Sequence, residues 1–174
     1  PAHQYYLTDM EQPYIDLFAS MTGRQLAEFN LLLGDKMDAL VSQRIAYEVN
    51  RRLFVPYLTP HRDWWWMYNT LERNTNNWNA VCNGNIVSAA VLLEQDNRRL
   101  AEIIARAARS LDDYLETFDA DGGSTEGPGY WSYGYGNYVL MSQLVEQRTN
   151  GRLSFLDSEQ IRKISQFPAN TVLS

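Results

Sequence analysis

Apolar residues recur along most of the chain at the three- and four-residue spacing of an amphipathic helix. The clearest case is the stretch 97–118, where Leu100, Ile103, Ile104 and Ala107 form one apolar stripe between charged positions. Strand-like alternation occurs only in segments too short to count as strands. The hydrophobic pattern therefore predicts an all-α protein.

The pattern and its punctuation place the expected helices along the chain. They cover 12–21, 24–58 with a possible break at Gly34–Asp35, 79–95, 97–118, 129–149, and a last segment that starts at Asp157. Pro56 and Pro60 are expected to end the second helical stretch, and Asn150–Gly151 the tyrosine-rich one. Short connections between these helices predict hairpins in a single domain over 1–174. Ordinary bundles and α/α toroids share this pattern.

Composition narrows the classes of partner. The 174 residues are 45% hydrophobic with a net charge of −6, so the overall field does not favour nucleic acid. Five arginines in 44–73 form the one plausible anion-facing stretch. No apolar run of about 18 residues predicts a membrane-spanning helix. Cys82 is the single cysteine and is expected to be a small buried residue, and no metal or cofactor site is predicted.

An asparagine-rich stretch, NTNNWNAVCNGN, covers 74–85 and holds six asparagines in twelve residues. One interpretation is a loop followed by a helix N-cap at Asn79, because the asparagine amide competes with backbone hydrogen bonding. The other places Asn79 and Asn83 one turn apart on a helix face, where both amides could meet a polar ligand. The sequence leaves both open.

A second unusual stretch, STEGPGYWSYGYGNYVLM, covers 124–141 and combines tyrosines with glycines. A helix that begins near Gly129 would divide its side chains between two faces. One face would carry Tyr130, Tyr133 and Asn137, and the other Trp131, Tyr135 and Tyr138. Either one face packs in the core while the other lines a cleft, or the whole segment is an aromatic core helix.

These two blocks, NNWNAVCNGN and DADGGSTEGPGYWSYGYGNY, resemble the heparinase II/III-like polysaccharide lyases over roughly 74–140, and more weakly the segment HRDWWW. The resemblance implies helical hairpins that form part of an incomplete (α/α) toroid, completed by a downstream β-sandwich domain of the same protein. It implies β-elimination on an acidic polysaccharide or oligosaccharide that contains uronic acid, with no cofactor. It also implies a bacterial protein in a periplasmic or secreted setting.

The resemblance also suggests roles for individual residues. In such lyases a tyrosine acts as acid or base while a group such as asparagine neutralises the uronate carboxylate. The catalytic candidates are Tyr133, then Tyr135 and Tyr130, with Asn79 as carboxylate neutraliser. The candidates for substrate binding are Asn77, Asn83, Glu126, Trp78, Trp66, Arg62 and Trp131.

Two other functions stay open. A glycan-binding helical module would use the same aromatic and amide side chains without chemistry. An inverting glycoside hydrolase on an α/α toroid would need two carboxylates, for which Glu126 could pair with Asp63 or Asp121. The first residues, PAHQYYLTDM, contain no initiator methionine or signal-peptide core, so we expect a piece of a longer lyase with little activity alone.

Overall fold

The computed structural model describes residues 13–60, 64–69 and 74–171, and every regular element in these ranges is helical. The helices are α1 (Leu17–Leu33), a 3₁₀ turn (Gly34–Lys36), α2 (Ala39–Val49), a π-helix (Asn50–Phe54), α3 (Val55–Leu58), α4 (Asn77–Leu93), α5 (Asn97–Leu115), α6 (Gly127–Arg148) and α7 (Glu159–Asn170). The predicted all-α fold is confirmed. None of these helices is long and apolar enough to cross a bilayer.

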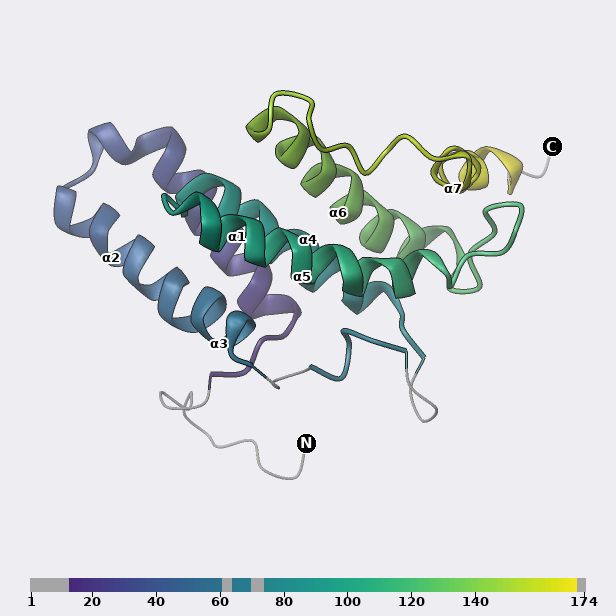
Figure 1. Ribbon diagram of the computed structural model, residues 1–174, viewed down its shortest axis with the longest axis horizontal. Coiled ribbons are helices and arrows are strands. Elements are labelled where there is room, and N and C mark those ends of the chain that lie inside the picture. Colours follow the sequence, from purple (N-terminus) through teal and green to yellow (C-terminus); the bar gives the residue numbers. More distant parts are fainter. Residues whose placement is uncertain (1–12, 61–63, 70–73, 172–174) are drawn as a thin grey trace.

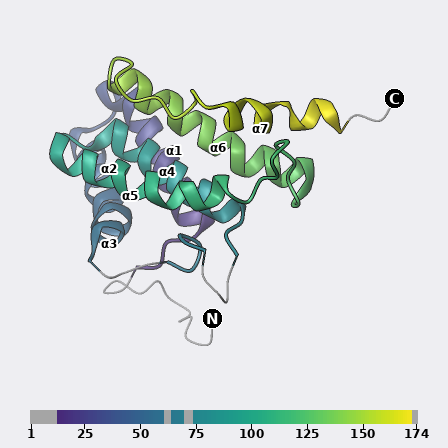
Figure 2. The ribbon, with the colours of Figure 1, turned by 45° about the vertical axis from the view of Figure 1, so that its right-hand side comes forward.

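The helices pair as antiparallel hairpins: α1 with α2 and α3, α4 with α5, and α6 with α7. Figure 1 shows the α2–α3 arm on one side of the molecule, α4 and α5 at its centre, and α6 and α7 on the other side. Figure 2 shows α7 lying alongside α6. This side-by-side arrangement is compatible with a segment of an α/α toroid.

Helices α1, α4 and α6 run in the same direction as neighbours. Asn77 at the start of α4 bonds Glu126 at the start of α6, and Gly84 farther along α4 meets Asn137 farther along α6. On the other side of α4, Cys82 lies beside Ser20 in the first turn of α1. The N-terminal ends of the three helices therefore lie at one end of this layer.

Helix α4 is the centre of the core, because it packs against α1, α5 and α6 at once. Its residues from Asn79 to Ala90 are all buried, including two asparagines that follow Asn79. Two glycines allow the close approach of α6: a Cβ on Gly84 would lie 2.9 Å from the Asn137 carbonyl oxygen, and one on Gly134 would lie 3.0 Å from the Asn77 Cβ.

Two expected boundaries are wrong. The segments 12–21 and 24–58 were expected to begin separate helices, but α1 runs without interruption through Gly23, which is buried where it meets Leu53. Pro56 does not end the second stretch: it lies within α3, which follows the π-helix directly and ends at Leu58, before Pro60. The π-helix between α2 and α3 has no signal in the sequence pattern.

The helix caps show both agreement and differences. Asp16 caps α1, and Asn76, not Asn79, is the N-cap of α4, because its side chain accepts a hydrogen bond from the Trp78 N–H. Ser158, not Asp157, caps α7. The predicted stop after α6 is confirmed by the positive φ angles of Asn150 (52°) and Gly151 (75°).

The contact between α4 and α6 gives a stability test. We expect Gly84→Ala to lower the free energy of unfolding by about 1–3 kcal/mol, because its methyl group would press on the backbone of Asn137. Gly136→Ala is the matched control: nothing lies within 4 Å of its Cβ position, so it should stabilise α6 by about 0.5–1 kcal/mol. Urea denaturation of both variants measures this, and equal effects would contradict the close packing.

Candidate functional site

The site is built around the first turns of α4 and α6, which a glutamate joins. Glu126 accepts hydrogen bonds from the backbone N–H of Asn77 at 2.9 Å and from its side-chain Nδ2 at 2.7 Å. Asn77 is buried, so water cannot bond its backbone N–H or its side-chain amide. The Glu126 carboxylate supplies a partner to each of these two groups. Glu126 therefore anchors the loop that leads into the tyrosine-rich helix.

Tyr133 lies on the side of α6 that faces the α1–α4 pair, together with Tyr130 and Asn137. Its ring is half-buried, while Tyr130 is exposed. None of the described residues hydrogen-bonds the Tyr133 hydroxyl. Burial raises the pKa of this phenol, with a smaller contribution from the nearby Cys82 thiol. Tyr133 is therefore a protonated phenol at neutral pH, with a hydroxyl free to meet a ligand.

Glycines leave open space beside Tyr133. Gly129 lies one turn before it on α6 and Gly136 one turn after it, and a Cβ at either position would meet nothing within 4 Å. Because neither glycine is needed for helix packing or carries a positive φ, the absence of side chains here leaves room next to the phenol. The tyrosine–glycine pattern thus creates an accessible strip around Tyr133.

An aromatic cluster adjoins this strip at the start of α1 and α4. The Trp65 and Trp78 ring centroids lie 4.9 Å apart, and the Trp65 Nε1 donates a 2.8 Å hydrogen bond to the Tyr14 hydroxyl. Trp78 lies one helical turn before Cys82, and Cys82 interacts with the Tyr133 phenol. The cluster therefore provides aromatic ring surface at the start of α4.

Two carboxylates, those of Asp16 and Glu126, lie at the N-terminal ends of α1 and α6. The first turns of α1, α4 and α6 point their positive dipole ends the same way. Asp16 and Asn76 cap α1 and α4, but no side chain caps α6, whose first residues Pro128 and Gly129 are exposed. Of its first backbone groups, the Gly127 N–H donates to the Ser124 carbonyl oxygen at 3.1 Å and Pro128 has no N–H, so this helix end leaves few donors free.

The other face of the tyrosine helix is structural. Trp131 donates to the Ile164 carbonyl at 3.0 Å, and the Tyr135 hydroxyl bonds the Ile161 carbonyl and the Ser165 hydroxyl. Tyr135 is buried, and burial raises its pKa. These side chains hold α7 against α6, so the structure separates Trp131 and Tyr135 from the face that carries Tyr133.

The buried asparagines form a network inside the core. Asn79 donates from its Nδ2 to the carbonyl oxygens of Met67 at 2.6 Å and Ser110 at 2.8 Å. Asn83 donates to the Asn79 side-chain oxygen and to the Ser110 hydroxyl, and it accepts from the Tyr57 hydroxyl at 2.6 Å. Both asparagines are completely buried, which supports a structural role for them.

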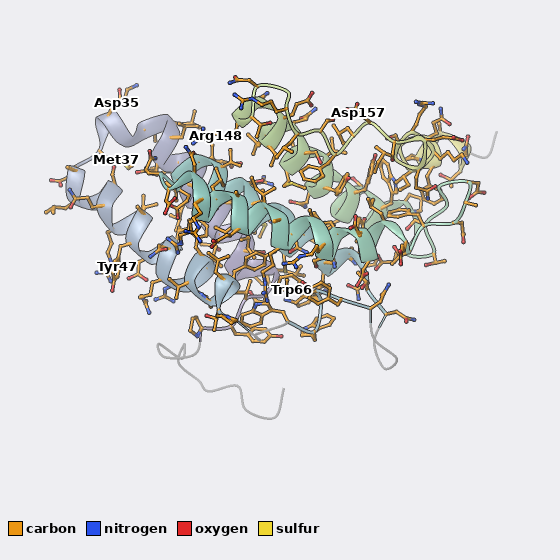
Figure 3. All side chains as sticks on the ribbon, viewed as in Figure 1. Asp35, Met37, Tyr47, Trp66, Arg148 and Asp157 are labelled. Atoms are coloured by element: carbon orange, nitrogen blue, oxygen red, sulfur yellow. The ribbon has the colours of Figure 1, made fainter. Side chains whose placement is uncertain are left out.

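Trp66 and Arg62 are two further residues that were predicted to bind substrate. Trp66, labelled in Figure 3 in the segment between α3 and α4, is 1% exposed and donates to the Ile15 carbonyl. It is therefore part of the core. Arg62 lies outside the described residues, as does Asp63, the possible second carboxylate of a hydrolase.

Three arginines of the stretch 44–73 form ion pairs with one glutamate of the same stretch. Glu48 pairs with Arg44, Arg51 and Arg52, each at 2.7 Å. Hydrogen bonds from Arg52 and then Arg51 lower the Glu48 pKa to about 2. The cluster is thus partly neutralised and lies on α2 and the π-helix, away from the first turns of α4 and α6.

Sequence analysis missed several residues of the site. Arg24 on α1 donates a 3.2 Å hydrogen bond to the Asn137 side chain, and Asn137 in turn donates to the Tyr133 carbonyl. Tyr14 and Trp65 complete the aromatic cluster. These contacts join residues more than fifty positions apart, so local spacing carries no signal for them. Among the described residues, no group of three His, Cys, Asp or Glu side chains is arranged to hold a metal ion.

The chain matches none of the protein families with which it was compared, and no curated protein matches it.

The buried amide network predicts a loss of stability on substitution. We expect Asn79→Leu to lower the free energy of unfolding by about 1–3 kcal/mol, because Asn83 and the Ser110 carbonyl would lose partners in the interior. Asn170→Leu, at an exposed position near the end of α7, is the control and should change stability little. Thermal or urea unfolding measures the difference, and an unchanged Asn79→Leu protein would contradict a structural role.

The environment of Tyr133 predicts a shifted titration. The difference in phenolate absorbance between the wild-type protein and Tyr133→Phe should show an ionisation above the ordinary tyrosine pKa of about 10. Burial disfavours the charged phenolate, so the phenol keeps its proton as pH rises past that value. A difference curve with its midpoint below the ordinary pKa would show instead that an unrecognised cation stabilises the phenolate.

Proposed function

We propose that this chain is the helical domain of a polysaccharide lyase that cleaves uronic-acid-containing glycans by β-elimination. The observation that carries the proposal is the Tyr133 hydroxyl, which has no partner among the described residues and lies between glycines with open space. The resemblance of 74–140 to heparinase II/III-like lyases, which made Tyr133 a catalytic candidate, is its other support. On that resemblance, a downstream β-sandwich domain completes the site, in a periplasmic or secreted protein.

The protonated phenol of Tyr133 suits the step in which the departing oxygen receives a proton. In β-elimination the proton at C5 of the uronate is removed, the C4–C5 double bond forms, and the bond from C4 to the glycosidic oxygen breaks. The departing oxygen takes up a proton. A tyrosine phenol is protonated at neutral pH, and the Tyr133 hydroxyl has no partner among the described residues, so it would enter the reaction as a proton donor and we propose it as the general acid. The group that removes the C5 proton would then come from the downstream domain.

The surroundings of Tyr133 supply features that an acidic sugar chain needs. The developing negative charge next to the uronate carboxylate needs dipoles aimed at it, and the helix dipole of α6 contributes at its N-terminal end, partly offset by the Glu126 carboxylate there. Trp78 and Trp65 provide ring surface for a sugar, and Tyr130 in the first turn of α6 is exposed. Substrate binding is therefore assigned to Trp78, Trp65 and Tyr130 together with the first turn of α6.

A glycan-binding module without chemistry is the second candidate. It is favoured by the burial of Asn79, which leaves the expected carboxylate neutraliser inside the core. The hydrolase alternative has weaker support, because Glu126 already accepts two hydrogen bonds from Asn77. An inverting hydrolase needs a second carboxylate across the site, and Asp121 sits on an exposed loop and bonds the Gly123 N–H.

The test uses the protein together with its downstream region and a panel of uronic-acid polysaccharides. We expect ultraviolet absorbance from the C4–C5 double bond to rise on at least one substrate. Tyr133→Phe should lower that rate by about 100-fold or more, since positioned acid–base groups contribute that much.

Tyr138→Phe is the matched control for this substitution. Its hydroxyl bonds the Phe155 carbonyl in the core, so the variant should lose some stability but keep its rate once folded. Saturated products would indicate hydrolysis. Binding without any product would support the module. An undiminished rate in Tyr133→Phe would exclude this tyrosine as the acid.

A further inference from the structure

A small cavity lies on the same face as Tyr133, farther along the α1–α4–α6 layer. It encloses about 180 Å³, with Arg24 and Glu28 of α1 on one side, Leu140 and Gln143 of α6 on the other, and Ser88 of α4 also in its lining. This volume is below the roughly 300 Å³ at which pockets hold drug-sized ligands. The cavity therefore has room for a single ring.

The serine in the lining of this cavity has an unmet hydrogen bond. Ser88 is 1% exposed, and its hydroxyl has no partner among the described residues. A buried hydroxyl without a hydrogen-bond partner has a free-energy cost, because it has lost its bonds to water. Because Ser88 lines the cavity, a ligand hydroxyl placed there would recover this cost.

The other lining groups indicate which kind of ligand fits. The Arg24 Nε lies 3.0 Å from the Glu28 Oε1, so the positive charge is balanced by a carboxylate, although this nitrogen makes no well-directed hydrogen bond. Gln143 and Gln147 each offer both a donor and an acceptor, and Leu140 offers an apolar surface. Mixed donors and acceptors beside an apolar wall match the hydroxyls and the C–H face of a sugar ring better than a carboxylate.

The cavity is aligned with the candidate acid. Tyr133, Asn137 and Leu140 follow one another at four- and three-residue spacing on α6, so they share a face. The seven residues from Tyr133 to Leu140 correspond to about 10 Å along the helix axis. The Arg24–Asn137 hydrogen bond lies between the two. A glycan chain that passes Tyr133 along this face would reach the cavity with a more distant sugar unit.

We propose that the cavity is a carbohydrate subsite that binds one sugar residue through its hydroxyl groups, at a distance from the bond cleaved next to Tyr133. The subsite rests on the proposed function for its place in the reaction, but its ligand class follows from its own lining. It makes the affinity for a glycan depend on chain length: short oligosaccharides occupy only the region around Tyr133, and longer ones gain the second contact.

The test compares uronic-acid oligosaccharides of increasing length, from disaccharide to hexasaccharide, on the protein with its downstream region. Gln143→Ala combined with Gln147→Ala removes exposed lining groups without touching the core. We expect the double variant to bind the hexasaccharide about tenfold more weakly, as two lost hydrogen bonds imply, and to bind the disaccharide unchanged. Gln43→Ala with Gln95→Ala, exposed glutamines outside the cavity, is the matched control.

A second variant and a direct readout separate the outcomes. Leu140→Trp should fill the cavity and cause the same length-dependent loss, and amide chemical shifts of Ser88 should move with the hexasaccharide but not with the disaccharide. Elimination without these effects would overturn the subsite alone. Ser88 shifts without any elimination would retain the subsite and overturn the lyase. Hexasaccharide binding that is equal in all variants, with Ser88 unmoved, would mean that the cavity holds only water.

Discussion

The structure depends on the hydrogen bonds that satisfy the asparagines inside α4. Asn79 and Asn83 would each cost free energy in the core without partners, and Ser110 of α5 bonds both of them. The Met67 carbonyl ties in the tryptophan segment, and the Tyr57 hydroxyl ties in α3. One polar network thus fixes the positions of three segments around α4, and it also determines where Trp65 meets Trp78.

The same constraint explains the division of the tyrosine helix. Since α4 is enclosed by α1, α5 and α6, the glycines at Gly84 and Gly134 are needed for close approach, whereas Gly129 and Gly136 are not. Tyr135 packs on α7 in the direction away from α4. What is left on α6 is a strip with Tyr133 at its centre, so the accessible phenol follows from how the helix packs on both sides.

The sequence predicted the parts of the fold that depend on local spacing. The stripe of α5, the break at Gly34 and the separation of Tyr133 from Tyr135 all follow from helical periodicity, and all are present. The burial of Asn79 could not be predicted from the sequence, because a helix cap and a buried amide have the same local pattern. Its environment is decided by Ser110, thirty-one residues away. Contacts such as that of Arg24 with Asn137 depend on packing alone.

The polar groups of α4 are distributed unevenly around its axis, and this asymmetry bears on function. Toward α5, the amides of Asn79 and Asn83 are bonded. On the opposite side, the Asn85 side-chain oxygen and the Ser88 hydroxyl are buried without a partner among the described residues. Apolar side chains there would pack at lower cost. Polar groups without partners thus lie on one side of α4, opposite the side whose amides are bonded to α5.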